Sequence, residues 1–66
     1  MKLDTEKVKR KMAENFLNNS TLSQKTGLTP NTVSNIVRGI TEPRAKNLKK
    51  ICEALNCTAA ELLKDE

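Results

Sequence analysis

Five short polar side chains lie close together in the middle of this 66-residue chain, on a segment that otherwise reads as a helix. Asparagine, serine and threonine are poor helix formers because their side chains compete for backbone hydrogen bonds. The same side chains donate and accept hydrogen bonds, so they make a poor helix surface but a good hydrogen-bonding one. These residues are Thr29, Asn31, Thr32, Ser34 and Asn35.

Residues suited to other chemistry are scarce. The chain has no histidine, no glycine-rich phosphate loop and no plausible triad or pair of inward carboxylates, so we expect no enzyme, no cofactor and no small-molecule substrate. Its two thiols, Cys52 and Cys57, cannot complete a four-ligand zinc site without histidine. We expect no metal site, and we expect both cysteines to stay reduced and to pack as small hydrophobic residues.

The length and composition limit the fold. Sixty-six residues predict a single domain, residues 1–66, with a thin core. With 36% hydrophobic residues, one aromatic residue and two glycines, the composition favours a compact all-α bundle over a β-barrel or a disordered tail. No apolar stretch is long enough for a signal peptide or for the roughly 20 residues that cross a bilayer, so we expect a cytoplasmic protein without membrane contact.

Charge is distributed unevenly along the chain. The net charge is +4, but residues 1–50 carry +7 and residues 51–66 carry −3. Such asymmetry is expected of a protein that presents one basic face to a polyanion, although a modest basic excess also occurs in proteins that bind none.

The first predicted helix begins near Asp4 or Thr5, either of which can cap it. Apolar residues follow at spacing four and predict a narrow stripe: Val8, Met12 and Phe16. The cations of residues 7–11 surround this stripe, either as a solvated helix face or as an edge that faces phosphate.

A short second helix is predicted next. Asn18 or Asn19 can serve as its N-cap, and Leu22 is its inward anchor. Gly27 can take the left-handed conformation that ends a helix, so the chain turns there.

The third predicted helix restarts at once and contains the polar residues described above. Thr29 is a good N-cap, and Pro30 fits the first helical position, where a missing N–H costs nothing. Gly39 ends the helix. Its apolar face consists of Val33, Ile36 and Val37.

A fourth and a fifth helix are predicted after a turn at residues 42–43. The fourth has the broadest apolar face of the chain, with residues at i, i+3 and i+4: Ala45, Leu48, Ile51, Cys52 and Leu55. The fifth begins with a capping-box pattern, Thr58 at the N-cap and Glu61 at N3. Leu62 and Leu63 follow, and they either close the core or form a surface for self-association.

The second and third helices are spaced as in a helix-turn-helix unit, in which a short turn fixes the second helix across the first. Residues 19–38 resemble this unit in the Cro/CI (XRE-type) family of phage repressors, and the matching residues are Leu22, Ser23, Gly27, Val33 and Ile36. The resemblance continues through Gly39, Pro43 and the segments NLKKICEALN and TAAELL, and so covers about residues 8–63. It implies an all-α, compact five-helix, lambda-repressor-like DNA-binding domain.

Four positions depart from the family's usual residues. Members commonly have glutamine where Asn19 stands and an apolar residue where Lys11 stands. They commonly have alanine at the position of Ser23, and serine or threonine at that of Arg44. None of these changes is expected to break the fold, but Asn19 is shorter than the glutamine it replaces.

The resemblance implies a role for the polar face. The third helix of such folds enters the major groove with its N-terminal residues against base edges. Asn31 can then pair bidentately with adenine, Thr32 can bond a base or touch a thymine methyl group, and Asn35 points the same way one turn later. Pro30 offers apolar contact only.

Phosphate contacts are implied on both sides of this helix. Asn19 and Ser20 begin the second helix, where the helix dipole favours an anion. The turn after the third helix supplies further candidates, which are Arg38, Thr41, Arg44 and Lys46. These contacts would position the protein without reading the sequence. The alternative is that the polar and basic side chains are merely exposed.

The implied function is that of a sequence-specific transcriptional regulator that binds double-stranded DNA, a Cro/CI-like repressor of phage or mobile-element origin. One recognition helix reads few base pairs, so a homodimer on a palindromic operator is expected. The alternative is a protein-interaction module, such as an antitoxin or an adaptor with the same fold. An extra unstructured arm or an aromatic anchor would favour that alternative, and the sequence shows neither.

Overall fold

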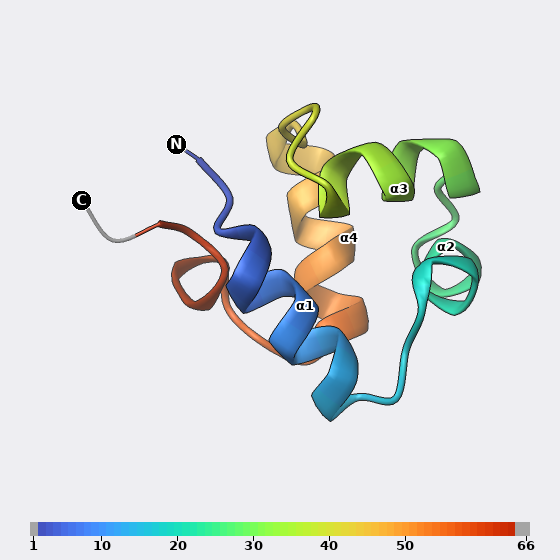
Figure 1. Ribbon diagram of the computed structural model, residues 1–66, viewed down its shortest axis with the longest axis horizontal. Helices are drawn as coiled ribbons and strands as arrows, with labels where there is room; N and C mark the ends of the chain where they lie inside the picture. The colour runs from blue at the N-terminus through green and yellow to red at the C-terminus, as the bar shows by residue number, and fades with distance from the viewer. Residues whose placement is uncertain (1, 65–66) are drawn as a thin grey trace.

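The computed structural model describes residues 2–64, which form four α-helices and one short 3-10 helix. These elements are α1 (Thr5–Glu14), α2 (Asn19–Thr26), α3 (Pro30–Val37), α4 (Ala45–Leu55) and the 3-10 helix η1 (Ala59–Glu61). Figure 1 shows α2 and α3 on one side of the molecule and the two chain ends on the other. Met1, Asp65 and Glu66, which the predicted domain 1–66 includes, lie outside the described residues.

The predicted all-α class is confirmed, but the predicted count of five helices is not. The fifth segment is only the 3-10 turn η1. The N–H of Thr58 donates to Glu61 Oε2 at 2.7 Å, which is the glutamate half of the predicted capping box. The turn ends there because Leu62 is fully buried in the core and Leu63 pairs in extended conformation with Leu3.

Three of the four α-helices begin with the side-chain caps that their sequences predict. Of the alternatives, Asp4 caps α1 and Asn18 caps α2, and Thr29 caps α3. Each of these side chains accepts a hydrogen bond from an N–H of the first turn, which the helix itself leaves unpaired. The fourth helix, α4, follows Arg44, whose side chain caps nothing.

Three helices end with one common backbone arrangement, the Schellman motif, in which one residue takes the left-handed conformation. That residue is Phe16 after α1 (φ 55°), Gly39 after α3 (φ 78°) and Asn56 after α4 (φ 54°). In each case the next N–H reaches back to the carbonyl five positions earlier, at 2.8–3.1 Å. Gly27 ends α2 in the same left-handed conformation (φ 75°), as predicted.

The prediction that Phe16 continues the apolar stripe of α1 is wrong. The helix ends two residues earlier, at Glu14, and the side chain of Phe16 is 94% exposed. Because the left-handed residue redirects the chain, Leu17 packs against the core instead. Glycine and asparagine tolerate this backbone conformation, whereas phenylalanine is strained in it.

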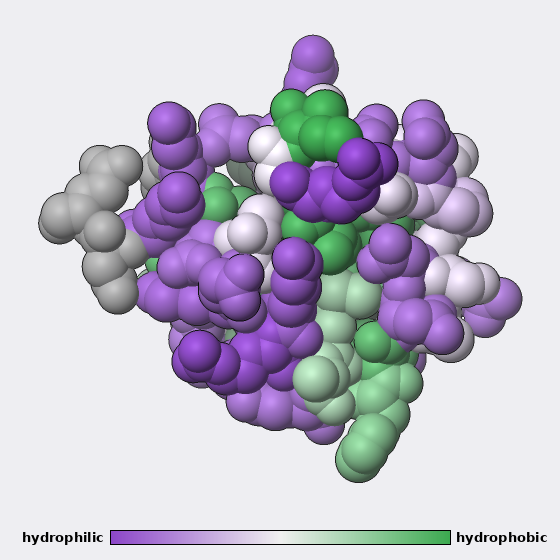
Figure 2. All heavy atoms as spheres, viewed as in Figure 1, coloured by the Kyte–Doolittle hydropathy of each residue, from purple (hydrophilic) through white to green (hydrophobic). Residues whose placement is uncertain are grey.

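The core draws on all four α-helices and on both chain ends. Its buried residues are Leu3, Val8, Met12, Leu22, Val33, Ile36, Val37, Leu48, Ile51, Cys52, Ala54, Leu55 and Leu62. Besides Phe16, one further residue of the predicted apolar faces is exposed, namely Ala45, the first residue of α4. Figure 2 shows that hydrophilic side chains cover most of the face in view, with small apolar patches between them. None of the described helices is long and apolar enough to span a membrane.

Candidate nucleic-acid interface

Buried hydroxyl groups hold the turn between α2 and α3. Ser23 Oγ donates to the carbonyl of Leu28, and Thr26 Oγ1 donates to the carbonyl of Leu22 at 2.8 Å. The N–H of Leu28 in turn donates to Thr26 Oγ1 at 3.3 Å. A buried hydroxyl is stable only when it is hydrogen-bonded, so these contacts fix the turn and with it the placement of α3 against α2. The sequence alone identifies Ser23 only as a residue of the family resemblance, at a position where members commonly have alanine.

The helix α3 has one buried and one polar side. Val33 is 1% exposed, and Ile36 and Val37 are also buried. On the other side, Asn31 is exposed and Asn35 is half-buried. No hydrogen bond joins either amide to another residue of the described chain. Both amides therefore keep their full capacity to donate and accept hydrogen bonds.

The other two predicted base contacts belong to the start of α3. Pro30, its first residue, is exposed. Thr32 is half-buried, and its hydroxyl accepts a hydrogen bond from Thr29 Oγ1 at 2.8 Å. Its N–H also donates to Thr29 Oγ1, at 3.2 Å. Thr32 thus takes part in the cap of α3, while the proton of its own hydroxyl stays available to a ligand.

All six residues predicted to contact phosphate are exposed, and they form two groups. Asn19 and Ser20 are the first two residues of α2. The other four follow α3 and lead into α4, and they are Arg38, Thr41, Arg44 and Lys46. The two groups therefore flank α3 along the chain.

The first N–H groups of α4 are not capped by a side chain, whereas the start of α2 is. No side chain caps α4, so its first N–H groups, which have no partner within the helix, can face an anion beside Arg44 and Lys46. At α2, the side chain of Asn18 already accepts from the N–H of Thr21 at 2.9 Å. The sequence signal for this difference is an arginine at a position where serine, threonine, asparagine or aspartate usually caps a helix.

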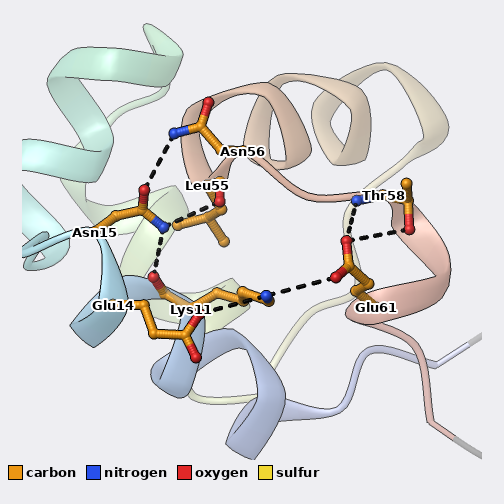
Figure 3. Close-up of polar contacts among 7 residues, drawn as sticks. All are labelled: Lys11, Glu14, Asn15, Leu55, Asn56, Thr58 and Glu61. Atoms are coloured by element: carbon orange, nitrogen blue, oxygen red, sulfur yellow. Dashed lines mark hydrogen bonds and ion pairs between the residues drawn. The ribbon is translucent and has the colours of Figure 1, made fainter.

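In contrast to the polar residues of α3, the polar residues at the ends of α1 and α4 form hydrogen bonds with one another (Figure 3). Asn15 Nδ2 donates to the carbonyls of Lys11 and Leu55, at 2.8 and 3.0 Å. Asn56 Nδ2 donates to Asn15 Oδ1 at 3.1 Å, and Lys11 Nζ lies 3.5 Å from Glu61 Oε1. This network ties together α1, α4 and η1. Lys11 thus has two acidic partners, Glu14 and Glu61, at a position where the family commonly has an apolar residue.

The ion pairs of this network shift two pKa values. The hydrogen bond and the charge of Glu14, followed by the charge of Glu61, raise the pKa of Lys11 above its ordinary 10.5. The N–H of Thr58, followed by the charge of Lys11, lowers the pKa of Glu61 below its ordinary 4.5. Both groups are open to solvent, which screens such pairs.

The two cysteines lie where small hydrophobic residues would. Cys52 is buried in the core, and Cys57 is half-buried against it. Burial raises the pKa of both thiols, that of Cys57 to about 11, so both are neutral at physiological pH. Within residues 2–64, no three histidine, cysteine, aspartate or glutamate side chains gather in a way that suits a metal ion.

The turn fixes α3 against α2, and α3 has an apolar inner side and a hydrogen-bonding outer side. This arrangement is that of a helix-turn-helix domain. Residues 7–66 match the model of the Cro/C1-type HTH DNA-binding domain. The chain therefore belongs to this family, as its sequence predicted, and DNA is the partner that the family indicates. No curated protein and no solved structure is similar enough to the chain to count as a match.

Proposed function

We propose that this protein is a sequence-specific transcriptional regulator, a Cro/CI-like repressor of phage or mobile-element origin that acts in the cytoplasm. Its α3 enters the major groove of double-stranded DNA. The outer face of α3 is the main support, because Asn31 and Asn35 present amides without a partner in the described chain. An asparagine amide matches the N6 and N7 groups of adenine. The capped start and buried face of α3 hold the helix that carries these amides, which limits the backbone entropy lost on binding.

The phosphate contacts position this helix on the duplex. Asn19 and Ser20 would contact the backbone at one edge of the groove. Arg38, Thr41, Arg44 and Lys46 would contact it at the other edge, where the uncapped start of α4 adds its free N–H groups.

A homodimer on a palindromic operator completes the proposal. Leu62 is unsuited to self-association because it is fully buried, but Leu63 is half-buried. It lines an apolar groove of about 400 Å³ together with Leu3, Leu48 and Ala59. A second copy seated on this groove would bury Leu63 and let two α3 helices read half-sites about one helical turn apart. Leu63→Ser should then weaken dimerisation in sedimentation equilibrium, and an unchanged dimer would reject this surface.

The proposal predicts a split between residues that read bases and residues that hold phosphate. Asn31→Ala should cost about 1–3 kcal/mol at one base position and relax the preference there. Arg44→Ala should weaken binding to all sequences and lower the salt slope by about one. Fluorescence anisotropy on a specific and a scrambled duplex, over a range of salt concentrations, separates the two effects. Equal behaviour of the two variants would contradict the assigned roles.

One observation favours the second candidate function, a protein-interaction module such as an antitoxin or an adaptor. Phe16 is a large, exposed aromatic side chain on a strained backbone, which is the type of anchor that protein interfaces use. Figure 2 shows an apolar protrusion at the lower edge, where Figure 1 has the turn after α1. Phe16→Ser should abolish binding to such a partner and leave DNA affinity unchanged. Loss of DNA affinity in this variant would reject a separate partner site.

A further inference from the structure

A polar cleft of about 400 Å³ lies where the end of α3 meets the start of α1. Three cations line it: Lys2, Arg38 and Lys64. Two threonine hydroxyls and one carboxylate complete the polar lining, those of Thr5, Thr41 and Glu42. The cleft therefore carries a net positive charge together with hydroxyl donors, which is the lining that a phosphate group requires.

The pairing of the chain ends places two of these cations. Leu3 and Leu63 form an antiparallel bridge, and the N–H of Lys64 donates to the carbonyl of Lys2 at 2.9 Å. A further bond, from the N–H of Asp4 to the carbonyl of Leu62 at 2.8 Å, holds the two segments in register. The two lysines, 62 positions apart in the sequence, thus stand side by side at the backbone level.

Gly39 brings Arg38 and Thr41 to the same cleft. A Cβ atom at Gly39 would stand 3.1 Å from Thr5 Cγ2, so the end of α3 approaches the start of α1 very closely. The backbone of Gly39 also takes the left-handed conformation (φ 78°), which redirects the chain after α3. Glycine suits both features, because it has no Cβ atom and takes the left-handed conformation without strain.

The three cations of the cleft are not neutralised within the described chain. No ion pair joins Lys2, Arg38 or Lys64 to an acidic residue there. Lys11, by contrast, is paired with both Glu14 and Glu61. An anion in the cleft is attracted by all three cations, and the single carboxylate of Glu42 offsets only part of this attraction.

The position of the cleft fits the edge of a DNA groove. The eight residues of α3 span about 12 Å, which equals the width of the major groove, about 12 Å. With the start of α3 against the bases, its end therefore reaches the sugar-phosphate backbone beside the groove. We infer that this cleft binds a backbone phosphate of the same duplex, held by Lys2 and Lys64 of the paired chain ends together with Arg38. This inference rests on the proposed function.

Two double variants with the same loss of charge test this inference. Lys2→Ala with Lys64→Ala removes both terminal cations from the cleft. Lys25→Ala with Lys50→Ala removes two lysines that line another cleft, beside Glu53. Circular dichroism first establishes that both variants are folded. Anisotropy with one specific duplex then gives the affinity of each protein between 50 and 200 mM salt.

The terminal double variant should lower the slope of log affinity against log salt by about two. Between 50 and 200 mM salt, its affinity should therefore fall by a factor about ten times smaller than that of the wild type. The control pair should keep the wild-type slope, and Lys2→Arg with Lys64→Arg should restore it. An unchanged slope in the terminal variant, or an equal fall in the control pair, would overturn the inference. If the wild-type protein prefers no duplex over random DNA, the proposed function fails instead.

A free anion is the other possible source of the phosphate group. Inorganic phosphate is titrated into the protein without DNA, at constant ionic strength, and followed by NMR at the amides of the cleft. One isolated phosphate cannot use the rest of the interface, so no saturation is expected below tens of millimolar. Saturation at submillimolar phosphate would overturn the assignment to the DNA backbone.

Discussion

Two pairs of asparagines, at different places in the molecule, use the same side chain in opposite ways. Asn15 and Asn56 bind each other, and Asn15 also binds the carbonyls of Lys11 and Leu55 (Figure 3). The side-chain amides of Asn31 and Asn35, on α3, make no hydrogen bond to the described chain. The amides of the first pair form hydrogen bonds that join the ends of α1 and α4. The second pair contributes nothing comparable to folding, so its amides remain available to a ligand.

The largest expected effect on stability comes from placing an aspartate on the buried side of α3 rather than on its polar side. Val33→Asp should unfold the domain, because it leaves an unpaired carboxylate in a thin core where Val33 is 1% exposed. Asn31→Asp, which adds the same group to the exposed side of the same helix, should leave the fold intact. Far-UV circular dichroism at 25 °C compares the two, and a folded Val33→Asp variant would contradict the packing described above.

The next effect separates the two asparagine pairs directly. Asn15→Ala should cost about 1–3 kcal/mol of unfolding free energy, because it leaves the Leu55 carbonyl and the Asn56 amide without their partner. Asn31→Ala should change stability by less than about 0.5 kcal/mol. Urea denaturation measures both. Equal losses would mean that Asn31 also supports the fold and would remove the contrast.

A smaller effect, of opposite sign, is expected at Phe16. Phe16→Gly should stabilise the domain by about 1 kcal/mol, because glycine takes the left-handed conformation freely and the exposed ring buries little surface. The greater flexibility of glycine in the unfolded chain offsets part of this gain. Phe16→Ala, which keeps a Cβ in that conformation, should stay near the wild type. A lower melting temperature for Phe16→Gly would show that the ring packs in solution.

The smallest effect concerns pH. The folded state holds the pKa of Glu61 below its ordinary 4.5, so the ionised carboxylate stabilises the fold above pH 4.5. This contribution is lost as the pH falls through the lowered pKa. Glu61→Gln keeps an oxygen that can accept from the N–H of Thr58 but removes the charge. The variant should therefore be slightly less stable than the wild type at pH 7, and thermal melts of the two should converge in acid. A difference that persists at pH 2 would exclude the charge as its cause.

Features with local causes could be predicted from the sequence. Thr29 and Pro30 mark the start of α3 and Gly27 marks the end of α2, because each acts through its own backbone conformation or first-turn N–H groups. The spacing of Val33, Ile36 and Val37 likewise predicted the buried face of α3. The family resemblance, too, was visible in the sequence, and the family model matches residues 7–66.

Features that depend on distant contacts could not be predicted. The stripe of Val8 and Met12 gave no sign that α1 ends before Phe16, since the Schellman motif there lacks its usual glycine. The placement of Lys2 beside Lys64 depends on the pairing of the chain ends, which leaves no periodic pattern in the sequence. The roles of Asn31 and Asn35 toward bases, in turn, stay predictions until DNA is present.

Selection of this protein on a random duplex library at physiological salt tests the central claim most directly. If a dimer reads DNA through Asn31 and Asn35 of α3, the selection should enrich an adenine-containing site, arranged as two inverted half-sites about one helical turn apart. Enrichment of a single half-site would support base recognition by α3 but contradict the proposed dimer. No enrichment over the input library, with the protein shown to be folded, would contradict sequence-specific DNA binding.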